Sequence, residues 1–334
     1  MASATEAPTI TPLFFPATTF SRIEPDLYLQ RHLEQGLRPQ GSARGFHDFL
    51  RVSTYSPSPG RCTLHAGNES GSGVIISAGT VVSVTRTRGA AGIYPNVEIL
   101  RGGFGSAPST EEMVLSQRCR ELLAAVFPAD DPVFRVGYVD ADDNAAASLL
   151  GEDADSVEDE EDKWLAFTVH VQVLSRNGPP FDHVWRAVIT ALGSILPVRF
   201  RVYDEETDGD LSPEAIENRF VVAASDTDEK ARHFPAARLK HLHSSTFGVA
   251  SITAASDSAA VPTEARTELL ADIEGEIEET CLTSTVHVVR DETHLYGVSV
   301  NVVDAGRDLF VRTTSGGLQI NRKQIAEALA LAKR

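Results

Sequence analysis

Residues 61–84 read RCTLHAGNESGSGVIISAGTVVSV, and this stretch decides how the fold is interpreted. Apolar and polar residues alternate from Cys62 to Ala66, the pattern of a half-buried strand. Gly67-Asn68 provides residues that tolerate positive φ, as hairpin turns require. A second apolar stretch follows from Val74 to Val84. The sequence therefore predicts two strands paired as a hairpin.

Strand-like and helix-like segments alternate through the rest of the chain. The clearest helix opens at Ser109, and Thr110 is expected to cap its first free amide groups. This mixed order predicts an α/β or α+β fold rather than a repeat solenoid. Further helices are predicted at residues 25–36, 181–196 and 321–333, and further strands at 46–52, 96–100, 164–174, 247–253, 285–289 and 295–302.

No Pro/Gly-rich linker divides the chain, so residues 25–334 are expected to form one unit after an extended N-terminal arm at residues 1–24. Two acidic segments, EDADSVEDEED at 152–162 and DEETDGD at 204–210, predict solvated inserts near residues 140–162 and 204–230. The formal net charge of -17 argues against broad nonspecific binding to nucleic acid. Because the acidic residues gather in these segments, the net charge describes the loops more than any binding surface.

Several classes of site are not supported by the sequence. Cys62, Cys119 and Cys281 lack metal-ligand spacing, which predicts buried, reduced thiols in a reducing compartment. Neither glycine cluster, at residues 67–73 or 102–105, has dinucleotide-binding spacing, and no phosphate-loop lysine follows. No apolar run approaches the roughly 20 residues of a membrane-spanning helix. We therefore expect no cofactor, no metal and no membrane association.

Seven segments, taken in order, resemble the ribonuclease PH family. They cover most of the chain outside the N-terminal arm and the acidic inserts. Each motif is weak alone, and their order and spacing together carry the resemblance. The segments are PDLYLQRHLEQGLRP (25–39), CTLHAGNESGSGV (62–74), PNVEIL (95–100), EEMVLSQRCRELL (111–123), FDHVWRAVITAL (181–192), LLADIEGEIEET (269–280) and GGLQINRKQIAEALALAKR (316–334).

The resemblance implies a ribonuclease PH-like fold, with two similar strand-helix halves and a C-terminal strand-helix portion. In this family, six such folds form a barrel of three heterodimers with S1/KH-type cap proteins, and RNA passes through the centre. In the eukaryotic RNA exosome the ring has lost phosphorolytic activity, and an associated nuclease degrades the RNA. The implied partners are other ring subunits, cap proteins, that nuclease and RNA, in the nucleus, nucleolus and cytoplasm.

Two departures from the family pattern bear on activity. The usual R-P-D-G-R reads RPQGS at residues 38–42, and no acid follows Glu278-Glu279 where active members carry a carboxylate. The resemblance therefore implies structural roles for Asp272, Glu278 and Glu279 and no catalytic residues in this chain. The alternative is a phosphate-dependent 3'-to-5' exoribonuclease, which would depend on Asp272 and Arg120.

Four arginines are candidates for RNA contacts. Arg86, Arg88 and Arg101 lie in or beside loops that could face a pore, and the resemblance places Arg120 near the position of an arginine on the family's arginine-rich helix. Such contacts would be made to the RNA backbone and would be largely independent of sequence. The alternative, that these are solubilising surface arginines, remains open.

Overall fold

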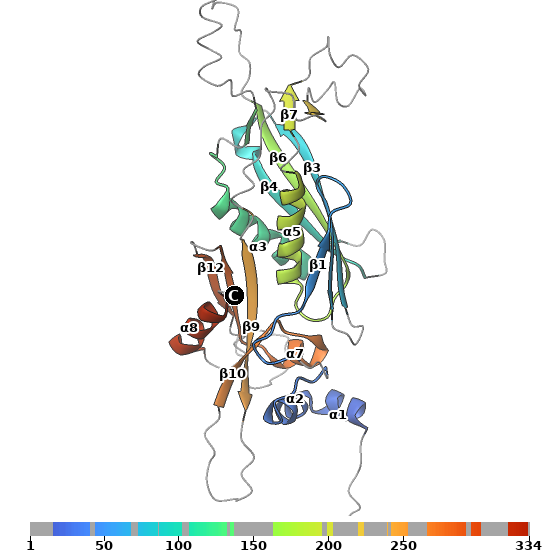
Figure 1. Ribbon diagram of the computed structural model, residues 1–334, viewed down its shortest axis with the longest axis vertical. Helices are drawn as coiled ribbons and strands as arrows, with labels where there is room; N and C mark the ends of the chain where they lie inside the picture. Colours follow the sequence, from blue (N-terminus) through green and yellow to red (C-terminus); the bar gives the residue numbers. More distant parts are fainter. Residues whose placement is uncertain are drawn as a thin grey trace, which may run out of the picture.

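The hairpin predicted at residues 61–84 is confirmed and forms the middle of a six-stranded sheet (Figure 1). β2 (Arg61–Gly67) pairs antiparallel with β3 (Gly73–Thr85), and β3 pairs on its other side with β6 (Lys163–Ser175). The order across the sheet is β1 (Val52–Tyr55), β2, β3, β6 and β4 (Gly92–Ile99), while β5 (Arg135–Val136) pairs with β6.

The computed structural model describes residues 16–40, 44–67, 73–85, 87–101, 107–131, 134–136, 163–195, 199–202, 220–223, 239, 242–252, 266–291, 295–301 and 320–332. Most of the two predicted acidic inserts lies outside these residues. Within the second insert, β8 (Phe220–Ala223) pairs with β7 (Arg199–Val202), so part of that segment is strand. Its sequence FVVA is an apolar run of the kind that favours strand pairing.

β6 and β4 run parallel, and a parallel pair requires a crossover connection. α3 (Thr110–Val126) lies in the connection between these two strands and packs against β4. On β6, Phe167, Val169 and Val171 are buried while His170 and Gln172 are exposed. The predicted period-two pattern is therefore confirmed, and it directs one face of the sheet toward the helices.

A second, four-stranded antiparallel sheet has the order β10 (Arg266–Ala271), β9 (His243–Ile252), β11 (Thr285–Arg290) and β12 (Leu295–Asn301). Ala328 of α8 (Arg322–Leu331) packs in a buried cluster with side chains of this sheet such as Phe247 and Val286. α2 (Pro25–Glu34) and α7 (Gly275–Cys281) share a further cluster with the sheet, in which Leu29 and Leu270 are buried.

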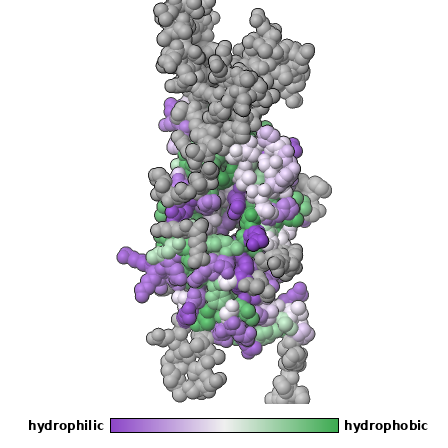
Figure 2. Space-filling model, viewed as in Figure 1, coloured by the Kyte–Doolittle hydropathy of each residue, from purple (hydrophilic) through white to green (hydrophobic). Residues whose placement is uncertain are grey.

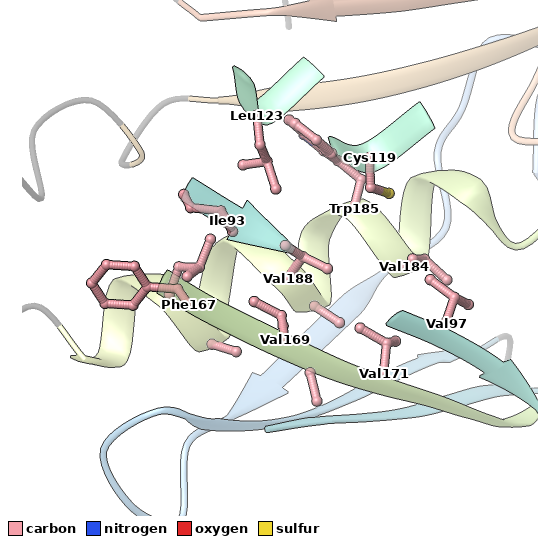
Figure 3. Packing of buried hydrophobic residues seen from close by; sticks show 14 of the residues in the cluster. Ile93, Val97, Cys119, Leu123, Phe167, Val169, Val171, Val184, Trp185 and Val188 are labelled. Carbon is pink, nitrogen blue, oxygen red and sulfur yellow. The ribbon is translucent and has the colours of Figure 1, made fainter. Parts of the chain in front are cut away.

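α5 (Phe181–Ile195) lies between the two sheets, because it contacts β2, β3 and β6 on one side and β9 on the other. Val184, Trp185 and Val188 are at most 1% exposed. Figure 3 shows these side chains in one cluster with those of β6, β4 and α3. Cys119 of α3 belongs to this cluster, and burial raises the pKa of its thiol to about 12. The prediction of buried cysteines is confirmed for Cys62 and Cys119 and is wrong for Cys281, which is only partly buried on the short α7 helix.

The strand predicted at residues 46–52 is wrong: β1 begins only at Val52. The backbone before it bonds to the second sheet instead. The Phe46 carbonyl accepts a hydrogen bond from the Ala271 amide at 2.7 Å, and the Leu50 amide donates to the Asp272 carboxylate at 2.8 Å. Because these groups find partners at the end of β10, they do not need a neighbouring strand.

The N-terminal arm is also not wholly extended, since α1 (Ala17–Ile23) is a helix. Pro16 precedes it directly, and a missing proline N–H costs nothing at a helix start. The Phe20 ring lies 6.2 Å from that of Tyr28, so α1 packs against α2. Residues 1–15 of the predicted arm lie outside the described residues.

None of the helices within the described ranges is both long and apolar enough to cross a membrane.

Candidate functional site

A buried ionic cluster joins the loop after α2 to α7. The Arg38 side chain is 0% exposed, and its guanidinium binds the Glu278 carboxylate through Nε (2.9 Å) and a terminal nitrogen (2.5 Å). It also donates to the carbonyls of Ala271 (2.8 Å) and Asp272 (3.0 Å). The Glu278 carboxylate accepts a further bond from the Glu274 amide at 2.8 Å. Arg38 is thus held on several sides by the segment that runs from the end of β10 into α7.

Arg44 adds a second cation to this cluster. Its guanidinium lies 2.5 Å from the Glu274 carboxylate and 3.7 Å from that of Asp272. Asp272 itself has a positive φ of 55°, and its carboxylate also accepts from the Leu50 amide. The backbone strain at Asp272 is compensated by these bonds, which hold its carboxyl group in one orientation. We call Arg38, Arg44, Asp272, Glu274 and Glu278 the Arg38 cluster.

A polar chain of side chains connects the start of α5 to the second sheet. Burial raises the pKa of the Asp182 carboxyl group, which accepts a hydrogen bond from the Ser244 hydroxyl. The two ring nitrogens of His287 lie 2.7 Å from the Thr246 hydroxyl and 3.0 Å from the Thr285 hydroxyl. Burial, and secondarily the charge of Arg118, lowers the pKa of His287 to about 3, so this histidine is neutral at physiological pH.

The Arg118 guanidinium sits 3.8 Å from the centre of the Phe181 ring, where α3 meets the first turn of α5. Burial lowers its pKa, while the nearby Asp182 opposes that shift. His183, also in this turn, lies 3.9 Å from the Asp272 carboxylate and so links this region to the Arg38 cluster. The described residues contain no group of histidines, cysteines and carboxylates that could hold a metal ion.

Of the predicted RNA-contact residues, Arg101 binds a buried carboxylate, although its own side chain remains 45% exposed. It pairs with the Glu112 carboxylate, which also accepts bonds from the Ile99 amide (2.7 Å) and from Ser109. Burial alone would raise the pKa of Glu112, but these hydrogen bonds and Arg101 lower it to about 2. The cap predicted at Thr110 is wrong: Ser109 is the N-cap, in a reciprocal capping box with Glu112. Glu112 is the acid three residues after the cap, which fixes the helix start at Ser109.

Arg88 and Arg120 remain at the surface on the β4 side of the first sheet. Arg88 pairs with Asp130 at 2.7 Å, packs 5.5 Å from the Trp164 ring and is still 57% exposed. The exposed Arg120 lies 4.8 Å from the Tyr94 ring. Arg86 lies outside the described residues. Arg88, Arg101 and Arg120, the three candidates that the structure describes, thus all keep exposed side chains.

Exposed apolar side chains include Leu100 (60%), Met113 (54%) and Leu174 (45%). On the face shown in Figure 2, hydrophobic and hydrophilic areas alternate across the coloured part of the surface.

The sequence alone did not point to Arg44, Glu274 or Asp182 as members of these networks. Arg44 follows the RPQGS segment by two residues, and Asp182 opens the predicted helix at 181–196, but neither has a motif of its own. Their membership in these networks is seen only in the structure, from the positive φ of Asp272 and from contacts between segments that are distant in the sequence.

Comparison with known proteins gives a match only at the level of structure. No protein-family model matches the sequence. No curated protein matches it either. A chain of the Archaeoglobus fulgidus exosome with RNA bound to the active site matches with a TM-score of 0.51 over 94% of both chains, at 15% identity. This chain shares the fold of that exosome chain, in agreement with the predicted ribonuclease PH-like fold class.

Two further solved structures are similar. An archaeal exosome core chain matches with a TM-score of 0.49 at 15% identity, over 95% of this chain and 94% of that one. Rice (Oryza sativa) Rrp46 matches with a TM-score of 0.43 at 11% identity, over 87% of this chain and 91% of that one. The predicted fold class is confirmed.

Proposed function

We propose that this chain is a non-catalytic subunit of an RNA exosome ring, of the type called ribosomal RNA processing protein forty-three. It would scaffold the barrel and help to guide RNA during 3'-to-5' processing and degradation, including ribosomal RNA maturation. The fold shared with an exosome chain over 94% of both sequences supports the ring assignment. The ordered motifs of the ribonuclease PH family support it independently.

The Arg38 cluster carries the non-catalytic part of the proposal. Phosphorolysis needs cationic groups to hold phosphate and a carboxylate near the scissile bond. In this chain Arg38 is fully buried and bound to Glu278, and the Arg44 guanidinium contacts Glu274 and Asp272. Arg38 and the nearby Arg44 are therefore neutralised inside the fold by three acids of residues 269–280, namely Asp272, Glu274 and Glu278.

The proposed partners are other ribonuclease PH-like ring subunits, S1/KH-type cap proteins, an associated catalytic nuclease and RNA. The proposed locations are the nucleus, the nucleolus and the cytoplasm. These follow from the ring assignment and depend on it.

Co-expression with the remaining ring proteins of the same organism tests the assignment. We expect this chain to co-purify at one copy per ring, with a mass measured by light scattering after size exclusion. A complete ring that assembles without this chain would contradict the proposal.

A separate assay tests the lack of activity. The purified chain and the ring are incubated with RNA and inorganic phosphate, and release of nucleoside diphosphates is measured. We expect none that depends on this chain. Phosphate-dependent release that is lost in Arg120→Gln, a change at the exposed surface, would instead support the exoribonuclease alternative.

A further inference from the structure

The turn between β1 and β2 presents two serines, each followed by proline. Its sequence is Tyr55-Ser56-Pro57-Ser58-Pro59-Gly60. Residues 55–59 are all exposed, and the turn is the blue loop beside α5 in Figure 1. A serine before proline is held in an extended backbone conformation, because the proline ring disfavours the helical region for the preceding residue. Exposure and an extended backbone are what a protein kinase needs in an acceptor segment.

Ser58 occupies the first position of a tight turn. The Arg61 amide donates to the Ser58 carbonyl at 3.1 Å, and Gly60 has a φ of +74°. This is the pattern of a type II turn, which favours proline at its second position, needs a residue with positive φ at its third, and is closed by a hydrogen bond from the fourth residue to the first. The far end of the turn is anchored, because the Gly60 amide donates to the Ser194 hydroxyl at the end of α5 at 3.0 Å.

The two serine hydroxyls differ in their surroundings. The Ser56 hydroxyl donates to the Arg61 carbonyl at 2.7 Å and lies 3.3 Å from the Ser58 carbonyl, so it is used inside the turn. The Ser58 hydroxyl makes no hydrogen bond to another described side chain or backbone group. Modifying Ser56 would break bonds that close the turn, whereas modifying Ser58 would break none of these.

We propose that Ser58 is a phosphorylation site for a proline-directed serine/threonine kinase and that Arg61 binds the resulting phosphate. The Ser58 oxygen would attack the γ-phosphorus of a nucleoside triphosphate. The bond from that phosphorus to the bridging oxygen breaks, the nucleoside diphosphate leaves, and the kinase takes up the hydroxyl proton.

The proposed phosphate would have a cationic partner in the same turn. The first and fourth residues of a β-turn have α-carbons less than about 7 Å apart, so a phosphate on Ser58 is within reach of the exposed Arg61 side chain. A phosphoserine carries a charge of about -1.5 to -2 at neutral pH and pairs well with a guanidinium. This inference does not depend on the proposed ring function.

The test uses the intact chain, a proline-directed kinase and ATP, with phosphorylated positions mapped and timed by mass spectrometry. Ser212, also followed by proline, serves as a sequence-based positive control for kinase activity. In the folded chain we expect Ser58 to be phosphorylated at least several-fold faster than Ser56. In a synthetic peptide of residues 52–64 we expect the two rates to be similar. Ser58→Ala should abolish the faster event, and Ser56→Ala should retain it.

The partner role of Arg61 is tested on the phosphorylated chain by phosphorus NMR. Pairing should lower the second pKa of the phosphate, relative to the Arg61→Gln variant, by roughly 0.1–0.7 units, the shift that an exposed ion pair gives. Phosphate on Ser212 with none on Ser58, or equal rates at Ser56 and Ser58 in the folded chain, would overturn the proposal. An equal phosphate pKa in the two proteins would overturn the role of Arg61.

Discussion

Arg38 and Glu278 are 240 positions apart in the chain, and their side chains form a fully buried, two-point ion pair. The pair fixes the loop after α2 against α7 and the end of β10. Because both groups are removed from water, each depends on the other for compensation of its lost hydration.

We therefore expect Glu278→Gln to lower the free energy of unfolding by about 3–5 kcal/mol, because it leaves Arg38 buried without its counter-charge. Urea denaturation followed by circular dichroism measures this loss. The matched control is Glu279→Gln, since the Glu279 side chain is 34% exposed and lies 3.7 Å from Arg176. That change should stay within about 0.5 kcal/mol. Equal losses in the two variants would contradict a special role for the Arg38 pair.

Gly178 brings the turn after β6 against the second sheet. Its φ is +108°, and a Cβ built there would lie 2.4 Å from the Ile273 carbonyl oxygen. Gly178→Ala should therefore destabilise the protein by more than about 1 kcal/mol, through both strain and displacement of that backbone. Gly79→Ala in β3 is the control, because a Cβ there meets nothing within 4 Å. Thermal unfolding compares the two variants. A Gly178→Ala protein as stable as Gly79→Ala would show that this backbone approach is not needed.

His287 makes stability depend on pH at the mildly acidic end. Its pKa is lowered from 6.5 to about 3, so the unfolded chain binds a proton there more readily than the folded one. The contribution of His287 to the free energy of unfolding is fully present above pH 6.5 and is lost progressively as the pH falls toward 3. His287→Gln should flatten the dependence between pH 6.5 and 4, measured by urea midpoints. The exposed His170 provides the comparison, and a His170→Gln curve should follow the parent protein. An unchanged slope in His287→Gln would contradict the prediction.

Glu112 makes the stability of the protein depend on pH in a more acidic range than His287 does. Its pKa is lowered from 4.5 to about 2, so its contribution is present above pH 4.5 and is lost as pH falls from 4.5 to 2. Glu112→Gln should destabilise the protein at pH 7 by about 1–2 kcal/mol, because glutamine can keep the capping-box hydrogen bond but loses the charge that pairs with Arg101 and strengthens the other bonds. The difference from the parent protein should disappear near pH 2. Glu121→Gln, at an exposed position on the same helix, should change stability little at either pH. A difference that persists at pH 2 would argue for lost packing instead.

Arg88 and Arg120 are the surface arginines on which RNA guidance can be tested. In the assembled ring, reversing both charges to Glu should reduce photo-crosslinking of this chain to RNA, and the reduction should be similar for different RNA sequences because backbone contacts carry no base information. The exposed Arg22 on α1 is the control for the effect of charge alone. Unchanged crosslinking in the double variant would assign these arginines to the solvated surface.

The sequence by itself determined the strands and helices whose apolar periodicity is strong. Residues 61–67, 73–79 and 167–174 alternate between buried and more exposed positions, because one face of the six-stranded sheet is buried and the other is not. The apolar positions of α5 likewise mark a helix buried on most sides, because it lies between two sheets. In these segments local preference and tertiary environment agree, so the pattern alone was enough.

Only the tertiary structure decided the segments whose backbone partners lie far away in the chain. Residues 46–51 look strand-like, but the Ala271 amide and the Asp272 carboxylate satisfy their polar groups, and no local pattern encodes that contact. The buried pairing of Arg38 with Glu278 is decided in the same way, since a charge in a sequence appears solvated until the fold brings its partner to it. The sequence predicted the fold class, whereas burial between distant segments determined which charged groups stabilise the fold.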